Sequence, residues 1–350
     1  MKLPVICTAL AAAFVMSACA ENAPENNVQR DSYHDNAGRT QEDIISGGVR
    51  MIPISTDYGD FKVWTKRVGN NPRIKVLILH GGPAMTHEYF EAVDSFFPDA
   101  GVEYYYYDQL GSYYSDQPDD DRLWEIPRFV DEVEQVRTAL GLNKDNFYLM
   151  GNSWGGILAM EYALEHQENL KGLLILNMMA SAPAYGAYAA DVLEKRLDPD
   201  ALAEIKALEA AEDYGNPRYE ELLIQEHYTK HVLRMPVEDW PEPVTRSMKH
   251  VNFHIYNLMQ GPSELGISGR LADWDVTDRI HEITVPTLVT VAQYDTMDPE
   301  HMRWMVEEIP HARALELPEG SHLAIYDDQQ RFFDGVIKFL KDVDQGTFDE

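Results

Sequence analysis

Cysteine is scarce in this chain. Its 350 residues include two, Cys7 and Cys19, and both lie near the N-terminus. The rest of the sequence therefore offers no cysteine for an intrachain disulfide or for a cysteine-ligated metal site. The sequence also lacks His-Glu-x-x-His and similar ligand clusters, which disfavours a zinc hydrolase. We expect neither a metal nor any other cofactor.

Positive charge is the second shortage. Lysine and arginine number 29 against 59 aspartate and glutamate residues, which gives a formal net charge of −30. A surface this acidic repels nucleic-acid phosphates and anionic lipid headgroups. We therefore expect no nucleic-acid partner and no electrostatic attachment to a membrane.

The N-terminal apolar run is short. Leu3–Val15 is too short to span a bilayer stably, and Lys2 before it and small residues after it are typical of a secretory signal. Cys19 then resembles the modified cysteine of a bacterial lipobox, which implies cleavage before it and acylation of its thiol and amine. The alternative is an ordinary signal peptide cut near Ala18 or Ala20.

We accordingly predict a lipoprotein signal peptide over residues 1–18 and a flexible, polar tether over residues 19–44. Lipid on Cys19, rather than a basic patch, would hold the protein at the membrane. Ala20 is not the aspartate that retains lipoproteins in the inner membrane of enteric bacteria, so the outer membrane, facing the periplasm, is favoured. A secreted periplasmic protein is the alternative.

The body of the chain alternates short apolar runs with helical patterns. Alternating residues at 48–55 and 61–68 flank a turn at 57–60, which predicts a β-hairpin. Further apolar runs predict strands, and the segments between most of them predict helices. The strands are expected at 74–79, 102–107, 147–150, 173–176, 287–291 and 314–317, and the helices at 88–97, 127–140, 157–165, 300–308 and 329–341. This order predicts an α/β fold with a mostly parallel, doubly wound sheet of eight strands.

The interval 181–273 interrupts this alternation. It is acidic and helical, with a clear helix start at Pro199, and it contains no convincing strand. We predict an all-helical cap inserted into a core made of residues 45–180 and 274–350. Some aromatic residues of the cap are candidates for lining a pocket, while most are expected to pack within it: Tyr185, Tyr188, Tyr228, Trp240, Phe253 and Tyr256.

Residues 151–155 read Gly-Asn-Ser-Trp-Gly, a G-x-S-x-G motif between a predicted strand and a predicted helix. A nucleophile elbow has this pattern, because a serine on a sharp strand-to-helix turn leaves no room for Cβ atoms on either side. Such a turn exposes the serine hydroxyl above the sheet, at the N-terminus of the following helix. Ser153 is therefore the candidate nucleophile.

Three further sites lie in the order that a serine α/β-hydrolase requires. Residues 80–83 read His-Gly-Gly-Pro after a predicted strand, so the N–H groups of Gly82 and Trp154 are candidate oxyanion donors. Asp295 and His322 follow the last two predicted strands. His322 is the candidate general base, and Asp295 would orient its imidazole. An epoxide hydrolase or a dehalogenase is disfavoured because their nucleophile is an aspartate.

These motifs combine into one pattern. It consists of His-Gly-Gly-Pro at 80–83, Tyr-Asp-Gln at 107–109, Gly-Asn-Ser-Trp-Gly-Gly at 151–156, Asp295 and Gly-Ser-His at 320–322. Over residues 45–340 this pattern resembles the proline iminopeptidase (prolyl aminopeptidase) family of serine α/β-hydrolases. Cap segments at 238–241, 259–264 and 273–275 resemble its tricorn-interacting-factor branch. The resemblance implies release of an N-terminal residue, often proline, through an acyl-enzyme.

The resemblance also implies an amine-binding role for one cap residue. Glu264 occupies the position of a glutamate that binds the substrate amine in that branch, and a carboxylate is the natural partner of a protonated amine. The alternative is a solvated glutamate at a helix end. The second amine-binding glutamate of the branch is replaced by Thr296, which weakens the expected clamp, and Asp298 is a candidate to compensate. Ala84 stands where the family has a glycine, and residues 110–115 also depart from the family pattern.

Three functions are compatible with these residues. The first is a membrane-tethered serine aminopeptidase that releases proline, or another small or apolar residue, from short peptides or amides with a free amine. The second keeps the triad but hydrolyses a carboxylic ester, a lactone or an acyl-amide. The third is a lipoprotein that binds a ligand without catalysis. The sequence leaves the oligomeric state open.

Overall fold

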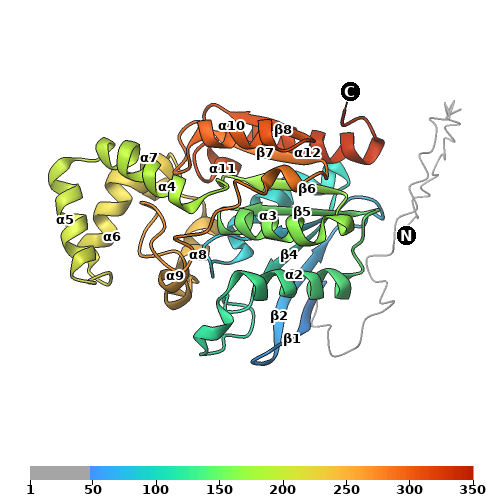
Figure 1. Cartoon of the computed structure of the whole chain (residues 1–350), viewed down its shortest axis with the longest axis horizontal. Helices are drawn as coiled ribbons and strands as arrows, with labels where there is room; N and C mark the ends of the chain where they lie inside the picture. The colour runs from blue at the N-terminus through green and yellow to red at the C-terminus, as the bar shows by residue number, and fades with distance from the viewer. Residues whose placement is uncertain (1–47, 350) are drawn as a thin grey trace, which may run out of the picture.

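The computed structural model describes residues 48–349, so the predicted signal peptide, Cys19 and the tether lie outside the described residues. Its centre is an eight-stranded sheet in the order β1-β2-β4-β3-β5-β6-β7-β8 (Figure 1). The pairs β1–β2 and β2–β4 are antiparallel and all other neighbouring pairs are parallel. The strands are β1 (Val49–Thr56), β2 (Gly59–Val68), β3 (Lys75–Leu79), β4 (Glu103–Asp108), β5 (Phe147–Asn152), β6 (Gly172–Leu176), β7 (Thr287–Ala292) and β8 (Ala312–Leu317).

Helices cover both faces of the sheet because its central strands are apolar on both sides. In β4, Tyr105 and Tyr107 belong to one core and Tyr104 and Tyr106 to the other. The first core packs against α2 (Ile126–Leu140), α3 (Trp154–His166) and α10 (Pro299–Glu308), and the second against η2 (His87–Ser95), α1 (Phe97–Ala100), α11 (Ala324–Asp327) and α12 (Gln329–Gln345). The predicted mostly parallel, doubly wound sheet is confirmed.

A helical insert connects β6 to β7. Its helices α5 and α6 project past one end of the sheet, opposite the end where the described chain finishes (Figure 1). Helix α8 instead packs against η2 on the core. An isolated bridge between Ser181 and Asp275 joins the two ends of the insert. Its α-helices are α4 (Ala182–Tyr188), α5 (Pro199–Ala210), α6 (Pro217–Leu223), α7 (Thr229–His231), α8 (Glu242–Lys249) and α9 (Phe253–Met259). The expected helical cap is therefore present.

The segment predicted as one helix at 88–97 differs in detail. It forms the 3₁₀ helix η2, which Thr86 caps by accepting a hydrogen bond from Glu88 N–H, followed by the separate α1. Phe96 has a φ of −127°, which interrupts the helix, and Pro98 in the first turn of α1 starts a new one. Among the described residues, no helix is long and apolar enough to cross a membrane.

Candidate active site

Ser153 lies in the tight turn between β5 and α3. Its φ of 56° and ψ of −124° are rare for a residue with a side chain, so the turn is strained. Three hydrogen bonds hold this conformation: Ser153 N–H donates to Leu176 O at 3.0 Å, and Ser153 O accepts from the N–H groups of Gly156 at 2.7 Å and Ile157 at 3.2 Å. The serine is 8% exposed and precedes the first residue of α3. This is the strand-to-helix geometry that the G-x-S-x-G motif predicts.

Two glycines allow the His-Gly-Gly-Pro loop to approach the nucleophile. A Cβ on Gly155 would overlap the carbonyl of Leu79, and a Cβ on Gly81 would lie 3.1 Å from the Cβ of Ser153. Gly81 N–H is already used, because it donates to the hydroxyl of Tyr89 at 2.7 Å. No hydrogen bond joins the N–H of Gly82 to another described residue, so this group remains a candidate oxyanion donor.

Gln109 links the two segments that carry the candidate oxyanion donors, because its side chain hydrogen-bonds to both Trp154 and His80. The indole N–H of Trp154 donates to Gln109 Oε1 at 2.7 Å, and Gln109 Nε2 donates to His80 O at 3.1 Å. Burial lowers the pKa of His80, although the nearby charge of Asp108 opposes this. The resulting neutral ring accepts Gln109 N–H at Nε2 with a distance of 3.1 Å. The Tyr-Asp-Gln motif therefore positions both sides of the candidate oxyanion hole.

Asp295 and His322 form a buried pair. His322 Nδ1 donates to Asp295 Oδ1 at 2.7 Å, and Asp295 has no exposed surface. Burial lowers the pKa of His322, but the charge of Asp295 and the hydrogen bond that it accepts raise it more, so the pKa lies above its ordinary value of 6.5. Because Nδ1 is committed to Asp295, Nε2 is the nitrogen available to activate a hydroxyl.

His322 and the end of the strand that precedes Ser153 line the same small cavity. Its wall includes Tyr89, Asn152 and His322, and Asn152 directly precedes the candidate nucleophile. The hydroxyl of Ser153 makes no hydrogen bond with another described residue. Such bonds commonly tighten only when substrate is present. The structure thus places the three candidate triad residues after the carboxyl ends of the parallel strands β5, β7 and β8.

Asn177 is a residue that the sequence reasoning missed. Its Nδ2 donates to Asp295 Oδ2 at 2.7 Å and to Ser321 O at 3.1 Å. Thr290 fixes its orientation by donating to Asn177 Oδ1 at 3.2 Å and accepting Asn177 N–H at 2.9 Å. The available signal was a polar residue directly after β6, at the sheet edge where the triad converges. Asn177 positions both the acid and the loop that carries His322.

Glu264 lies in the cap segment that follows α9. One carboxylate oxygen, Oε1, accepts a hydrogen bond from the hydroxyl of Tyr256 at 2.6 Å. The other, Oε2, is buried and has no hydrogen-bond partner among the described residues. Its main-chain carbonyl accepts from the hydroxyl of Tyr185 at 2.7 Å and from His227 Nε2 at 3.0 Å, which fixes the segment.

The charge of Glu264 reaches the catalytic candidates. It adds to the effect of Asp295 in raising the pKa of His322. Burial raises the pKa of Tyr89 far above 10, and the charge of Glu264 contributes to this rise. A buried carboxylate oxygen without a partner is costly, so this position favours a ligand that donates hydrogen bonds and carries positive charge.

The departures from the family pattern have structural roles. Thr296 Oγ1 lies 3.2 Å from His322 Nδ1 and 3.4 Å from Asp295 Oδ1, so its side chain belongs to the buried pair. Asp298 Oδ1 accepts Glu300 N–H at 3.0 Å and caps α10, which engages one of the two oxygens of this candidate compensating carboxylate. Ala84 has a left-handed φ of 59°.

Six aromatic residues of the cap are candidates for lining the pocket. Three of them, Tyr185, Tyr228 and Tyr256, contact Glu264. Trp240 is buried and donates to Met235 O at 3.0 Å, whereas Phe253 is 62% exposed. Aromatic residues therefore contribute to the site chiefly by holding the glutamate.

Comparisons with known proteins agree on one family. A family model described as the α/β hydrolase fold matches residues 75–329. The chain is 61% identical over 300 residues to a proline iminopeptidase from Elizabethkingia meningoseptica, which covers 85% of this chain and 100% of that protein. Among solved structures, VinJ is similar with a TM-score of 0.77 and 28% identity, covering 83% of this chain and 98% of VinJ. A proline iminopeptidase from Mycobacterium smegmatis is similar with a TM-score of 0.73 and 29% identity, covering 84% of this chain and 99% of that one.

Proposed function

We propose a mechanism for this chain, which belongs to the proline iminopeptidase family of α/β hydrolases and acts as a serine aminopeptidase that removes N-terminal proline. The substrate is a short peptide or amide with a free N-terminal amine. The observation that carries the proposal is the buried, unpartnered Oε2 of Glu264 beside the Asp295–His322 pair. A protonated amine would satisfy that oxygen and its charge.

In the proposed mechanism, the bound amine fixes the carbonyl of the first residue over Ser153. The Ser153 hydroxyl attacks this carbonyl and transfers its proton to His322 Nε2, while Asp295 stabilises the imidazolium. The N–H groups of Gly82 and Trp154 stabilise the negative charge that develops on the carbonyl oxygen. His322 then protonates the leaving amine, and water attacks the acyl-enzyme by the same steps to release proline.

The test compares three substrates: proline p-nitroanilide, N-acetyl-proline p-nitroanilide and p-nitrophenyl acetate. We expect hydrolysis of the first, a large loss on N-acetylation, and loss of all activity in Ser153→Ala. Glu264→Gln should lower kcat/KM for the free-amine substrate about 100-fold, because a charge-assisted contact is lost. Glu220→Gln, at an exposed position in α6, is the matched control and should behave like the wild type.

Two outcomes would contradict the proposal. Equal hydrolysis of the free and N-acetylated anilides would remove the amine requirement. Hydrolysis of the ester alone, dependent on Ser153, would favour an esterase or acyl-amide hydrolase, and Thr296 in place of a second carboxylate would then explain the change of substrate. Failure of Ser153 to react with a fluorophosphonate in the folded protein would point to a binding protein without catalysis.

We also propose that the enzyme belongs to the tricorn-interacting-factor branch. Support comes from the cap segment at 259–264, which carries the branch-like Met-Gln-Gly-Pro-Ser-Glu sequence and ends in the glutamate beside the site. A variant Thr296→Glu, which restores the second carboxylate of that branch, should tighten binding of free-amine substrates and lower KM. An unchanged or higher KM would count against this assignment.

The last proposal concerns location. We propose that the mature chain begins at a lipidated Cys19 and is held at the outer membrane, facing the periplasm, with the enzyme on a polar tether. Support comes from the positive charge, apolar run and small residues that precede Cys19. A secreted periplasmic enzyme is the alternative, and the two are separated by experiment below.

A further inference from the structure

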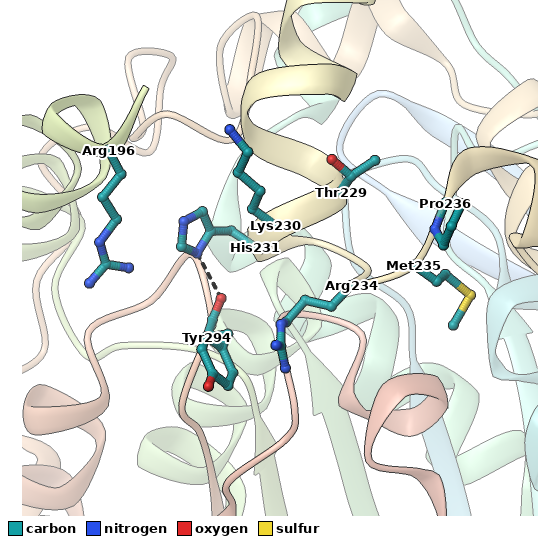
Figure 2. Close-up of a pocket in the computed structure, with 8 residues that line it drawn as sticks. All are labelled: Arg196, Thr229, Lys230, His231, Arg234, Met235, Pro236 and Tyr294. Atoms are coloured by element: carbon teal, nitrogen blue, oxygen red, sulfur yellow. Dashed lines mark hydrogen bonds between the residues drawn. The ribbon is translucent and has the colours of Figure 1, made fainter. Parts of the chain in front are cut away.

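A basic cavity lies beside the candidate active site, at the junction of cap and core. Its volume is about 690 Å³, and its lining includes Arg196, Lys230 and Arg234 from the cap and Tyr294 from the core (Figure 2). No aspartate or glutamate is among its lining residues. Three cations around one cavity are notable in a chain with 29 basic and 59 acidic residues. The cavity is therefore suited to an anion.

The three cations differ in how far they are already neutralised. Lys230 forms a solvent-accessible ion pair at 3.0 Å with Glu226, four residues earlier in the chain. Pairs of this kind contribute little to stability. Arg234 lies over the ring of Tyr294 at 3.5 Å, donates to Glu319 O at 2.8 Å and pairs with Glu319 Oε2 at 3.8 Å, so it is largely structural.

Arg196 is the cation most available to a ligand. Among the described residues it has no carboxylate within ion-pair distance, and its side-chain partner is the neutral hydroxyl of Tyr188. Its guanidinium lies on the opposite side of Tyr294 from Arg234 in Figure 2. Arg196 and Lys230 are therefore the residues best placed to bind an anion.

The cavity is joined directly to the catalytic candidates. His231 Nδ1 donates to Tyr294 O at 2.8 Å, and His231 O accepts His322 N–H at 3.0 Å. Tyr294 is the residue directly before Asp295. Burial lowers the pKa of His231, so this residue contributes hydrogen bonds rather than charge. A ligand in the cavity thus lies against the two loops that hold the acid and the histidine.

Resting on the proposed aminopeptidase function, we propose that this cavity binds a carboxylate carried by the leaving part of a short peptide substrate. A peptide whose amine binds Glu264 must extend away from that negative charge, and its far end is itself an anion. Each residue spans at most about 3.5 Å, so a leaving group of one to three residues extends up to about 10 Å from the scissile bond. Arginine presents a planar fork that matches a carboxylate.

The structure therefore assigns a substrate class: short peptides with a free carboxylate. The carboxylate can be the C-terminus or the side chain of aspartate or glutamate, because the same cations would bind either. Peptides blocked as C-terminal amides, and arylamides, would lose this contact.

The test compares Pro-Gly-Gly with its C-terminal amide, using wild type, the double variant Arg196→Gln/Lys230→Gln, and Lys195→Gln. Lys195 is exposed, next to Arg196 in sequence, outside the cavity lining, and pairs with exposed Asp191, so it is the matched charge control. We expect wild type and Lys195→Gln to prefer the free acid by about fivefold in kcat/KM, mainly through KM. The double variant should bring this ratio close to one.

The ratio of acid to amide is internal to each variant, so a general loss of activity does not affect it. Comparison of Pro-Glu-amide with Pro-Gln-amide identifies the source of the carboxylate, because a side-chain carboxylate would favour the first peptide. Raising the salt concentration should weaken either preference by screening.

Three results separate the possible failures. If the wild type cleaves the peptides but shows no preference in either pair, the carboxylate proposal is wrong. If the double variant keeps the wild-type ratio, the cavity is not the site. If the wild type cleaves neither the peptides nor proline p-nitroanilide, the proposed function itself fails.

Discussion

At the scale of single residues, the structure separates groups that react from groups that position them. Asn177 belongs to the second kind, because it holds Asp295 Oδ2 and the carbonyl of Ser321 with one amide. Asn177→Ala should lower kcat for proline p-nitroanilide about 10–100-fold while KM changes less than about twofold, since the acid loses its fixed orientation.

The readout for Asn177 must exclude a general loss of structure. Thr290→Val removes only the hydroxyl that orients the amide, so it should produce a smaller fall in kcat in the same direction. Near-UV circular dichroism and thermal unfolding would establish that both variants are folded. A folded Asn177→Ala enzyme with wild-type kcat would show that the amide has no positioning role.

The pH dependence follows from His322. In the proposed mechanism the imidazole must be neutral to accept the serine proton, and its pKa is raised because the charge of Asp295 and the hydrogen bond to it outweigh the lowering effect of burial. Activity should therefore fall on acidification with an apparent pKa above the ordinary value of 6.5 for histidine. A limb at or below 6.5 in the pH profile of kcat/KM would contradict this.

Glu264 offers a separate check of the same pKa. Because its negative charge also raises the pKa of His322, Glu264→Gln should move the acidic limb to lower pH. The limb is best measured with p-nitrophenyl acetate, which has no amine, so that loss of amine binding does not confuse the result. The exposed control Glu220→Gln should leave the limb where it is in the wild type.

The sequence predicted the residues that follow strands and failed where tertiary packing decides. Ser153, Asp295 and His322 each come after an apolar run, so their meeting at one sheet edge followed from the topology. Asn177 also follows a strand, but an asparagine there has no motif, and its role depends on a left-handed φ of 53° and a partner 118 positions away. The role considered for Asp298 stays a prediction, since its Oδ1 caps a helix and Oδ2 is not used by that cap.

At the scale of secondary-structure elements, one charged cluster fastens the cap to the core. Glu88 in η2 has no exposed surface and accepts from Arg246 and His250, in and directly after α8, at 2.9 and 2.7 Å. Burial raises the pKa of Glu88, but hydrogen bonds from Thr86, His250, Tyr114 and Arg246 lower it below its ordinary value of 4.5. The Glu88 carboxylate is therefore charged at neutral pH.

Arg246→Met should weaken this connection. Arg246 bonds to both Glu88 and Glu91, and the loss of charged hydrogen bonds to a buried carboxylate should cost about 2 kcal/mol of unfolding free energy. Arg303→Met removes exposed pairs with Glu300 and Glu316 and should cost less than about 1 kcal/mol. Denaturant unfolding of the three proteins measures both differences.

The sign of the pH effect gives this prediction a second measurement. Because the pKa of Glu88 is lowered in the folded state, its contribution is complete above 4.5 and is lost as the pH falls below that value. The stability difference between wild type and Arg246→Met should shrink on acidification. A difference that stayed constant down to pH 3 would mean that Arg246 acts through packing alone.

Element prediction succeeded where burial is simple. Strands buried on both faces were found to within about two residues, because continuous apolar runs have few other uses. The elements of the cap were harder to predict, since its helices are short and are interrupted by π-helical segments at Ala189–Leu193 and Ile224–Tyr228. The three cations of the basic cavity lie in different parts of this irregular helical segment: Arg196, Lys230 and Arg234. No periodicity in the sequence could therefore reveal that they line one cavity.

At the scale of the whole molecule, charge and location are linked. The full chain carries a formal net charge of −30, which disfavours electrostatic attraction to an anionic membrane surface, so the proposed attachment requires another force. The proposed acylation at Cys19 would supply it, because each buried methylene contributes about 0.8 kcal/mol and two chains anchor a protein stably. The proposed anchor at Cys19 therefore predicts a different response to salt from that of an electrostatically attached protein.

Cys19→Ala should move the enzyme from the membrane fraction to the soluble periplasmic fraction and abolish incorporation of labelled palmitate. Cys7→Ala, inside the predicted signal peptide, removes the other cysteine and should change neither result. A wash with 1 M salt should leave the wild type on the membrane, because screening acts on charges and not on acyl chains. If the wild type is already soluble and carries no acyl group, the segment is an ordinary signal peptide and the enzyme is a free periplasmic one. Release by salt would instead show that an electrostatic partner holds the protein despite its charge, and would overturn the lipid anchor.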